Sequence, residues 1–164
     1  MCIRDRNTTL QDGVFKIVAR KKIDRLSENF NKKSPYYPTL TDAELWFDIL
    51  NNIIFKRKLP AFDSISIRRL RGAVGQVVFE DQQKLTRKRK RKPRECHLEL
   101  HYKMKSFNTF LEVLGHEMVH LWQYYMLEDN SCNHNIDFYK WRRVFGANGL
   151  KLTLTVDNET TNID

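Results

Sequence analysis

The sequence predicts a single domain of the α+β class, in which a small antiparallel sheet packs against helices. Two stretches, 41–55 and 107–126, repeat apolar residues every three or four positions, which is typical of amphipathic helices. Three short runs between them, 64–68, 73–80 and 96–102, are typical of strands, and the last alternates clearly between apolar and polar residues. Antiparallel pairing is the most economical arrangement of three such strands.

The chain before the first of these helices divides into two parts. Residues 1–6 look like translated sequencing adapter, so we exclude them, including Cys2, from the fold. Residues 7–40 form an N-terminal helical segment and linker, with the helix expected over 10–30 and the linker over 34–38. Thr41 and Glu44 then form a capping-box signature, which predicts that the first helix of the domain begins there.

The second half of the chain carries its own boundary signals. Ser106 is the predicted N-cap of the second helix. Residues 137–145 predict a further helix that ends at Gly146, and an Asn-Gly turn then leads into an alternating strand over 150–156. We therefore place the domain at 41–156 and a polar tail at 157–164.

The second helix contains the segment His116-Glu117-Met118-Val119-His120. Side chains four residues apart lie on one face of an α-helix, roughly 6 Å apart, so His116 and His120 can hold one ion. Glu117 then lies beside that ion without ligating it, where a general base for water is needed. Two ordinary surface histidines are the alternative, but a chain with five histidines seldom matches this spacing by chance.

A catalytic zinc usually takes three protein ligands, so a third side chain must come from outside the helix. Cys132, His134 and Asp137 are the nearest downstream candidates, whereas Glu128 follows the helix too closely to fold back. We favour His134, because imidazole suits zinc and the polar segment 128–133 can reverse the chain.

His97 and His101 also stand four residues apart. On a strand, however, this separation spans roughly 13 Å, which is too far for two rings to bind one ion. We expect both to lie on the solvent-facing side of the third strand.

The stretch from about 42 to 156 resembles the SprT-like metalloprotease domain family, which includes the Spartan-type DNA–protein crosslink proteases. The matching features occur in the family's order: Phe55-Lys56-Arg57-Lys58-Leu59-Pro60, Ala73-Val74-Gly75, the HEMVH helix and His134-Asn135-Ile136-Asp137-Phe138. The resemblance implies a zincin-like fold with one Zn²⁺ held by His116, His120 and His134, and with Glu117 as the catalytic base. The family often flanks its third histidine with glycines, whereas this chain has Asn133 and Asn135.

The resemblance also implies a zinc metalloendopeptidase that cleaves proteins bound to or crosslinked with DNA, and hence a role in crosslink repair. Glu117 would take a proton from water and return it to the leaving amine. Tyr124, Tyr139 and Arg142 lie near the motifs and are candidates for stabilising the oxyanion. Two alternatives stay open: a non-proteolytic DNA-binding adaptor with a structural zinc, and a zinc peptidase with a specific regulatory substrate.

The formal charge of +9 is concentrated in one segment, so the rest of the chain is nearly balanced. We expect a basic loop over 81–95, between two strands, that binds the phosphates of DNA non-specifically, single-stranded DNA included. A solvated hairpin tip is the alternative, because runs of like charge are often only that. Eight cationic side chains without an acidic one make up the run: Lys84, Arg87, Lys88, Arg89, Lys90, Arg91, Lys92 and Arg94.

Composition limits the remaining possibilities. The 41% of hydrophobic residues suffices for a modest core, and no run approaches the ~20 apolar residues of a membrane span. With Cys2 set aside, Cys96 and Cys132 argue against a disulfide scaffold and favour a reducing compartment. We therefore expect a cytoplasmic, DNA- or nucleoid-associated monomer with protein substrates and no membrane partner.

Overall fold

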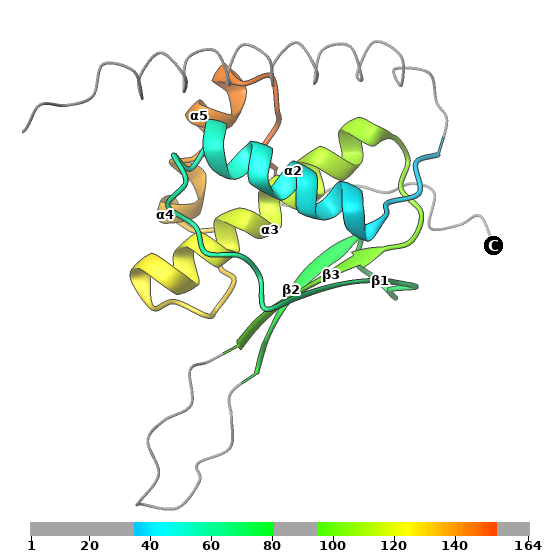
Figure 1. Cartoon of the computed structure of the whole chain (residues 1–164). Helices are drawn as coiled ribbons and strands as arrows, with labels where there is room; N and C mark the ends of the chain where they lie inside the picture. The colour runs from blue at the N-terminus through cyan, green and yellow to red at the C-terminus, as the bar shows by residue number, and fades with distance from the viewer. Residues whose placement is uncertain (1–34, 81–94, 154–164) are drawn as a thin grey trace, which may run out of the picture.

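A computed structural model describes residues 35–80 and 95–153, and Figure 1 shows how their helices and strands are arranged. The elements are α2 (Leu40–Ile53), β1 (Ser64–Arg68), β2 (Gly75–Glu80), β3 (Glu95–His101), α3 (Phe107–Leu127), α4 (Ile136–Tyr139) and α5 (Arg142–Ala147). Helices α2 and α3 cross one face of the sheet, and α4 and α5 lie on the side of them away from the sheet. The expected α+β class is therefore confirmed.

Three expectations concern residues that lie outside the described ranges. They are the helix over 10–30, the cationic run of 84–94 and the polar tail of 157–164. Within the described ranges, none of the helices combines the length and the apolar character needed to cross a bilayer.

The strands form a mixed sheet in the order β1-β3-β2, so the predicted antiparallel sheet is wrong for one of its two pairings. β2 pairs with β3 antiparallel, with Gly75 opposite Leu100, whereas β1 pairs with β3 parallel, with Ser64 opposite His97. Alternation along a strand shows which side chains share a face, but it does not show which strand lies alongside or in which direction.

The two faces of β3 differ as the alternation predicts. Leu98 and Leu100 are fully buried under the helices. On the other face, His97 Nδ1 lies 2.6 Å from Ser64 Oγ, and His101 Nδ1 lies 2.9 Å from the carbonyl oxygen of Lys103. The two imidazoles thus have separate partners and do not form one ligand pair.

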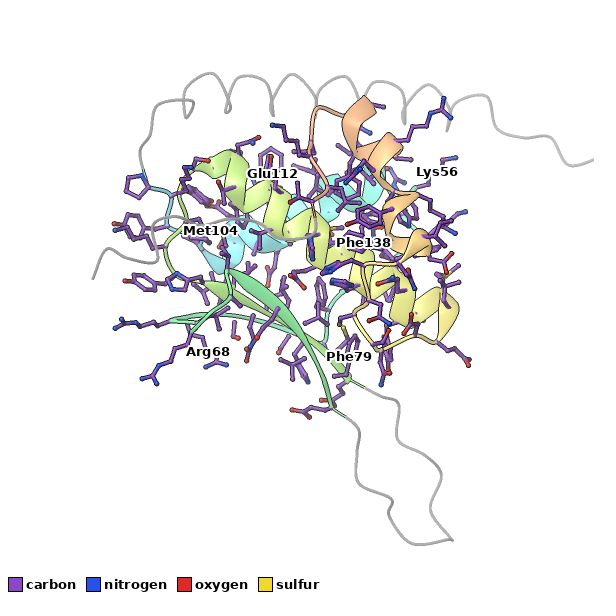
Figure 2. All side chains as sticks on the ribbon, turned by 180° about the vertical axis from the view of Figure 1, so that it is seen from behind. Lys56, Arg68, Phe79, Met104, Glu112 and Phe138 are labelled. Atoms are coloured by element: carbon purple, nitrogen blue, oxygen red, sulfur yellow. The ribbon has the colours of Figure 1, made fainter. Side chains whose placement is uncertain are left out.

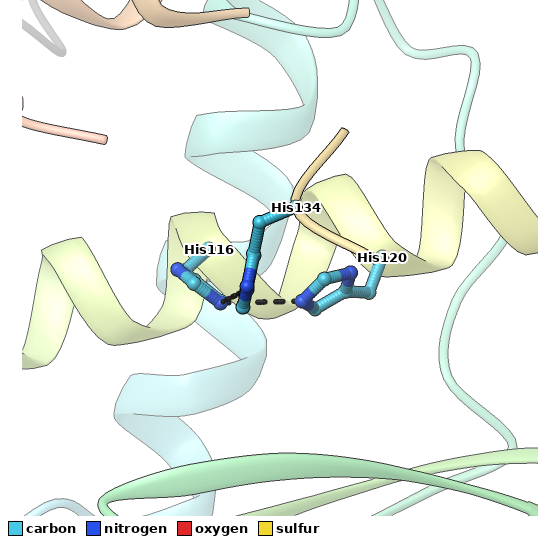
Figure 3. Close-up of side chains that lie close together, drawn as sticks. All are labelled: His116, His120 and His134. Carbon is cyan, nitrogen blue, oxygen red and sulfur yellow. Dashed lines mark hydrogen bonds between the residues drawn. The ribbon is translucent and has the colours of Figure 1, made fainter. Parts of the chain in front are cut away.

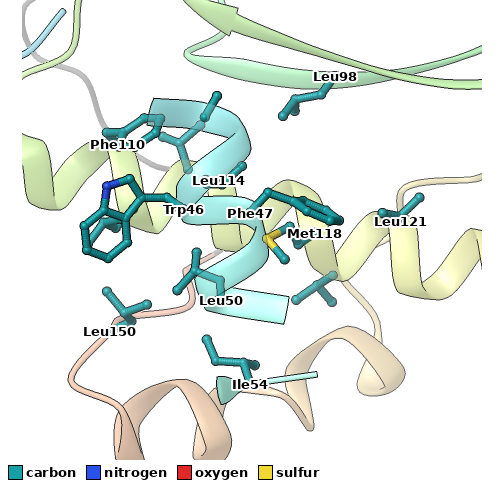
Figure 4. Packing of buried hydrophobic residues seen from close by; sticks show 14 of the residues in the cluster. Trp46, Phe47, Leu50, Ile54, Leu98, Phe110, Leu114, Met118, Leu121 and Leu150 are labelled. Carbon is teal, nitrogen blue, oxygen red and sulfur yellow. The ribbon is translucent and has the colours of Figure 1, made fainter. Parts of the chain in front are cut away.

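The core lies between α2, α3 and the sheet, and Figure 4 shows the side chains that fill it. Both long helices contribute their apolar stripes, and the buried residues include Trp46, Leu50, Phe110, Leu114 and Met118. Because α3 packs against α2, β2 and α4, it is enclosed along most of its length.

The N-caps of these two helices were predicted with different success. Ser106 caps α3 as expected, and its side chain accepts a hydrogen bond from the Thr109 backbone N–H at 3.1 Å. The cap of α2 is Thr39 rather than Thr41: its hydroxyl accepts from the Asp42 N–H at 3.1 Å. Thr39 has the extended backbone (φ −115°, ψ 159°) that a cap requires, whereas Thr41 already lies within the helix.

The helix expected over 137–145 is two short helices. The N–H of Trp141 bonds to the Phe138 carbonyl, three residues back, and this tighter turn separates α4 from α5. Gly146 does not cap α5 but lies within it: the helix ends at Ala147, and Asn148 is its C-cap. Gly149, the next residue, adopts φ +77°, and the Leu150 N–H bonds back to the Phe145 carbonyl.

The strand expected over 150–156 is not formed over 150–153, and its remainder lies outside the described residues. Leu150 and Leu152 are buried at 3% and 2% exposure, whereas Lys151 between them is exposed. The alternation there reflects packing of an extended segment against the helical core, not pairing in the sheet.

Gly115 allows α3 and α5 to approach closely. A Cβ at this position would lie 2.5 Å from Cε1 of the buried Phe145 ring.

We expect Gly115→Ala to lower the free energy of unfolding by about 1–3 kcal/mol, because the overpacked ring must shift. Urea unfolding would measure this. Gly146→Ala on α5 is the matched control, since its Cβ meets no atom within 4 Å; an equally large decrease at Gly146 would contradict the close-approach argument.

Candidate metal centre

Three histidine side chains from two segments converge on one point. His116 and His120 project from successive turns of α3, and His134 reaches them from the loop that precedes α4 (Figure 3). The Nε2 atom of His116 lies 3.2 Å from that of His120 and 3.0 Å from that of His134. The structure thus brings together all three sequence-predicted ligands, with a ligand atom of each within 4.8 Å of the others.

The opposite nitrogens of the two helical rings have oxygen partners. His116 Nδ1 donates to the carbonyl oxygen of Thr153 at 2.9 Å, and His120 Nδ1 donates to Oε1 of Gln123 at 2.8 Å. Because Nδ1 carries the proton in each of these rings, Nε2 presents a bare lone pair to the centre. Such acceptor partners are the usual outer contacts of metal-binding histidines.

This donor set fits a metal ion. Bare imidazole nitrogens about 3 Å apart repel one another unless a cation or a proton lies between them. Two nitrogens bound to a tetrahedral ion at about 2.0–2.1 Å would stand roughly 3.3 Å apart, close to the 3.2 Å and 3.0 Å separations here. The chemistry and the spacing therefore match a nitrogen-ligated transition metal.

Burial keeps these imidazoles neutral, as metal ligation requires. It lowers the pKa of His116 to about 3, and the neighbouring rings of His120 and His134 act in the same direction. Burial also lowers the pKa of His120 and of His134. At neutral pH the three rings are therefore unprotonated and available to an ion.

Glu117 lies next to His116 on α3 but outside the histidine group. Its side chain is 6% exposed, and burial raises the pKa of its carboxyl to about 8. Gly75 at the start of β2 packs against it: a Cβ there would lie 2.5 Å from Val113 and 3.5 Å from Cγ of Glu117. A cation on the histidines would lower the pKa of Glu117 again and favour its ionised form.

Phe138 forms an apolar wall beside the three imidazoles. Its ring centroid lies 4.9 Å from that of His116, 5.1 Å from that of His120 and 4.7 Å from that of His134. Figure 2 shows it between α3 and α4. The sequence placed Phe138 in an expected helix and in the family motif that starts at His134, but gave it no role at the site.

The other downstream candidates do not join the ligand group formed within the described ranges. Asp137 forms an ion pair with Lys140 at 3.3 Å. Glu128 is exposed at the end of α3 with φ 55°, and Cys132 is a half-buried free thiol with φ 52°. Burial, followed by the negative charge of Glu117, raises the pKa of Cys132 to about 11, so this thiol is a poor ligand.

The three oxyanion candidates have contacts elsewhere. Tyr124 packs against Phe79 of β2, with ring centroids 4.6 Å apart and the ring planes tilted by 42°. The Arg142 guanidinium lies 4.8 Å over the Tyr139 ring and donates to the Leu152 carbonyl at 3.4 Å. Arg142 thus fixes the segment whose next residue, Thr153, accepts from His116.

A second group of possible ligands, Glu80, Glu95 and His97, lies where β2 ends and β3 begins. Its members are partly or fully exposed, and His97 already contacts Glu95 at 3.1 Å and Ser64 at 2.6 Å. These are ordinary surface side-chain contacts, so the buried histidine group is the candidate metal centre.

The neutral state of His116 has a consequence for the metal-free protein. Because the unfolded chain binds a proton at pH about 6.5 and the folded chain only near 3, stability is lost as the pH falls between these values. We expect this residue to contribute a decrease of about 2 kcal/mol in the free energy of unfolding between pH 7 and 5. Urea unfolding in a chelator would measure it. An equally steep pH dependence in His116→Gln would contradict this assignment.

Comparison with known proteins agrees with this geometry. A search of curated proteins finds no match. The model of the SprT-like family matches residues 43–158, a range that begins in α2 and includes the sheet, the histidine group and the Thr153 segment. The chain therefore belongs to the SprT-like family.

Proposed function

We propose that this chain is a zinc-dependent metalloendopeptidase with a zincin-like fold, which cleaves proteins bound to or crosslinked with DNA. The convergence of three neutral imidazoles is the observation that carries the proposal, together with the buried Glu117 that follows the first of them on α3. Membership of the SprT-like family supports a metallopeptidase at the level of the family.

The number of ligands favours a catalytic over a structural ion. Structural zinc is usually enclosed by four protein ligands, whereas catalytic zinc has three and an open position. In the part of the chain that the structure describes, no fourth histidine, cysteine or carboxylate joins His116, His120 and His134. Glu117, which follows His116 directly on α3, also gives an enzyme a possible base, whereas a purely structural site has no need of one.

Each group of the chain then has a chemical task. When bound to the histidines, zinc would supply the charge that acidifies water and polarises a scissile carbonyl. The Glu117 carboxylate accepts the proton of the attacking water and returns it to the leaving amine. The Phe138 ring keeps bulk water from one side of the histidines, which strengthens the electrostatic interactions there.

The proposed link to DNA rests on charge. The cationic run of 84–94 connects β2 to β3, whose adjoining ends carry Glu80 and Glu95. Eight neighbouring cations favour the phosphate backbone over a particular base sequence. DNA would then hold the protease near proteins attached to the same strand.

Glu117→Gln should separate metal binding from catalysis. We expect the variant to retain one zinc ion, because Glu117 is outside the ligand group, and to lose peptide hydrolysis by about 10²–10⁴-fold, because an amide cannot accept the proton. Metal analysis and cleavage of a DNA-binding protein, with and without single-stranded DNA, would measure the two effects.

Glu112→Gln is the matched control for this variant. Glu112 is on the same helix, and its carboxylate accepts from Asn108 at 3.0 Å, so hydrolysis should persist. Undiminished cleavage by zinc-loaded Glu117→Gln would remove Glu117 from its role. If wild type binds zinc and DNA but is as inert as the variant, the non-proteolytic adaptor becomes the better explanation.

Neutralising the central cations, Lys88 to Lys92, should weaken DNA binding and flatten its dependence on salt, by about one unit of slope for each phosphate that the variant no longer neutralises. Zinc content should not change. In the control, glutamine replaces Lys56 and Lys58. These two lysines are exposed cations outside the run. Equal DNA affinity in the neutralised variant and wild type, across a salt titration, would refute this role for the run.

A further inference from the structure

Gln123 is a buried amide one turn beyond His120 on α3. Its exposure is 1%, the lowest among the buried polar residues in the described part of the chain. An amide enclosed in this way lowers stability unless its donors and acceptor are paired. Its contacts therefore indicate why an amide, rather than a leucine, is useful at this position.

Both ends of the amide have partners, and these partners fix its orientation. Nε2 donates to the Asn133 carbonyl oxygen at 3.0 Å and to Oδ1 of Asn135 at 3.2 Å. Because two oxygens face one end, that end must be the NH₂ group. Oε1 is thereby turned toward His120 and accepts from its Nδ1 at 2.8 Å.

The first consequence concerns His120. An acceptor at Nδ1 holds the proton on that nitrogen and leaves Nε2 bare and directed at the other imidazoles. The bond also fixes the rotation of the ring. Gln123 thus prepares the second helical ligand.

The second consequence concerns His134. The two oxygens that accept from Gln123 belong to the residues on either side of His134. Asn135 in addition accepts from the Phe138 N–H at 3.2 Å and so caps α4. The amide of Gln123 therefore ties the loop that carries the third ligand to the helix that carries the first two.

We propose that Gln123 is a positioning residue of the metal centre, which sets the tautomer of His120 and the place of His134 through one amide. This inference rests on the proposed function of the histidines as metal ligands. Outer partners of metal-binding histidines typically contribute about 10–100-fold to metal affinity. Gln123 has two ligands to act on, so the upper part of that range is expected.

The test compares metal affinity in full-length wild type, Gln123→Leu and Gln123→Glu, with a competing chromophoric chelator for Zn²⁺ and with the absorption spectrum of Co²⁺ bound in its place. Gln123→Leu removes all three hydrogen bonds at similar volume and should lower metal affinity toward the upper end of this range, about 100-fold. Gln123→Glu keeps the acceptor for His120 but faces the two loop oxygens with a carboxylate. It should bind metal more tightly than the leucine variant and less tightly than wild type, with an altered Co²⁺ spectrum.

Melting curves with and without metal separate positioning from general stability. A purely structural role would lower the melting temperature equally in both states, whereas a positioning role reduces the increase that metal produces. Asn108→Leu is the control, since Asn108 lies about two turns before His116 on the same helix and donates to Glu112. It should keep the affinity and the Co²⁺ spectrum of wild type.

The outcomes are distinct. Wild-type affinity and spectrum in folded Gln123→Leu would overturn the inference while leaving the proposed function intact. If the leucine variant does not fold, Gln123→Glu decides, and wild-type affinity with an unchanged spectrum there would overturn it equally. A wild-type protein that binds no metal would overturn the proposed function, and this inference with it.

Discussion

The burial of polar groups along α3 is the constraint on which the rest of the structure depends. This helix runs through the core, yet it carries His116, Glu117, His120 and Gln123 at 7%, 6%, 4% and 1% exposure. Groups buried to this extent need partners. The Thr153 carbonyl is the partner of His116, and the loop around His134 supplies partners for Gln123. The bare Nε2 atoms of the imidazoles face one another, and a bound cation would remove their mutual repulsion.

Two close approaches keep α3 in this enclosed position. Gly115 admits the Phe145 ring of α5 on one side, and Gly75 brings the start of β2 against Val113 on the other. Gly115 directly precedes His116, and Val113 lies about one helical turn before Glu117. The enclosure that raises the pKa of Glu117 and lowers the pKa of His116 therefore follows from positions that lack a side chain.

The sequence predicted the features that depend on neighbouring residues better than those that depend on contacts between separate segments. The HEMVH spacing and the Ser106 cap are local, and both gave correct geometry. His134 was inferred from turn chemistry and from the family resemblance, and it does reach the other two rings. The parallel pairing of β1 with β3 and the contact of His116 with the Thr153 carbonyl join segments far apart in the chain, so no local pattern specified them. The bonds of Gln123 to Asn133 and Asn135 depend on how the loop between α3 and α4 folds, which the spacing of residues does not show either.

The return of the chain from α3 to His134 shows how the site is built without the glycines that the family often uses there. Glu128 and Cys132 adopt left-handed backbone, with φ 55° and 52°, which costs a non-glycine residue of order 1 kcal/mol or more. Hydrogen bonds offset the strain at Glu128: its N–H group and that of Asp129 both donate to the Gln123 carbonyl. The Gln123 backbone carbonyl therefore accepts the bonds that close the end of α3, and its side chain holds the returning loop. The position of His134 is thus set by the last turns of the helix that carries His116 and His120.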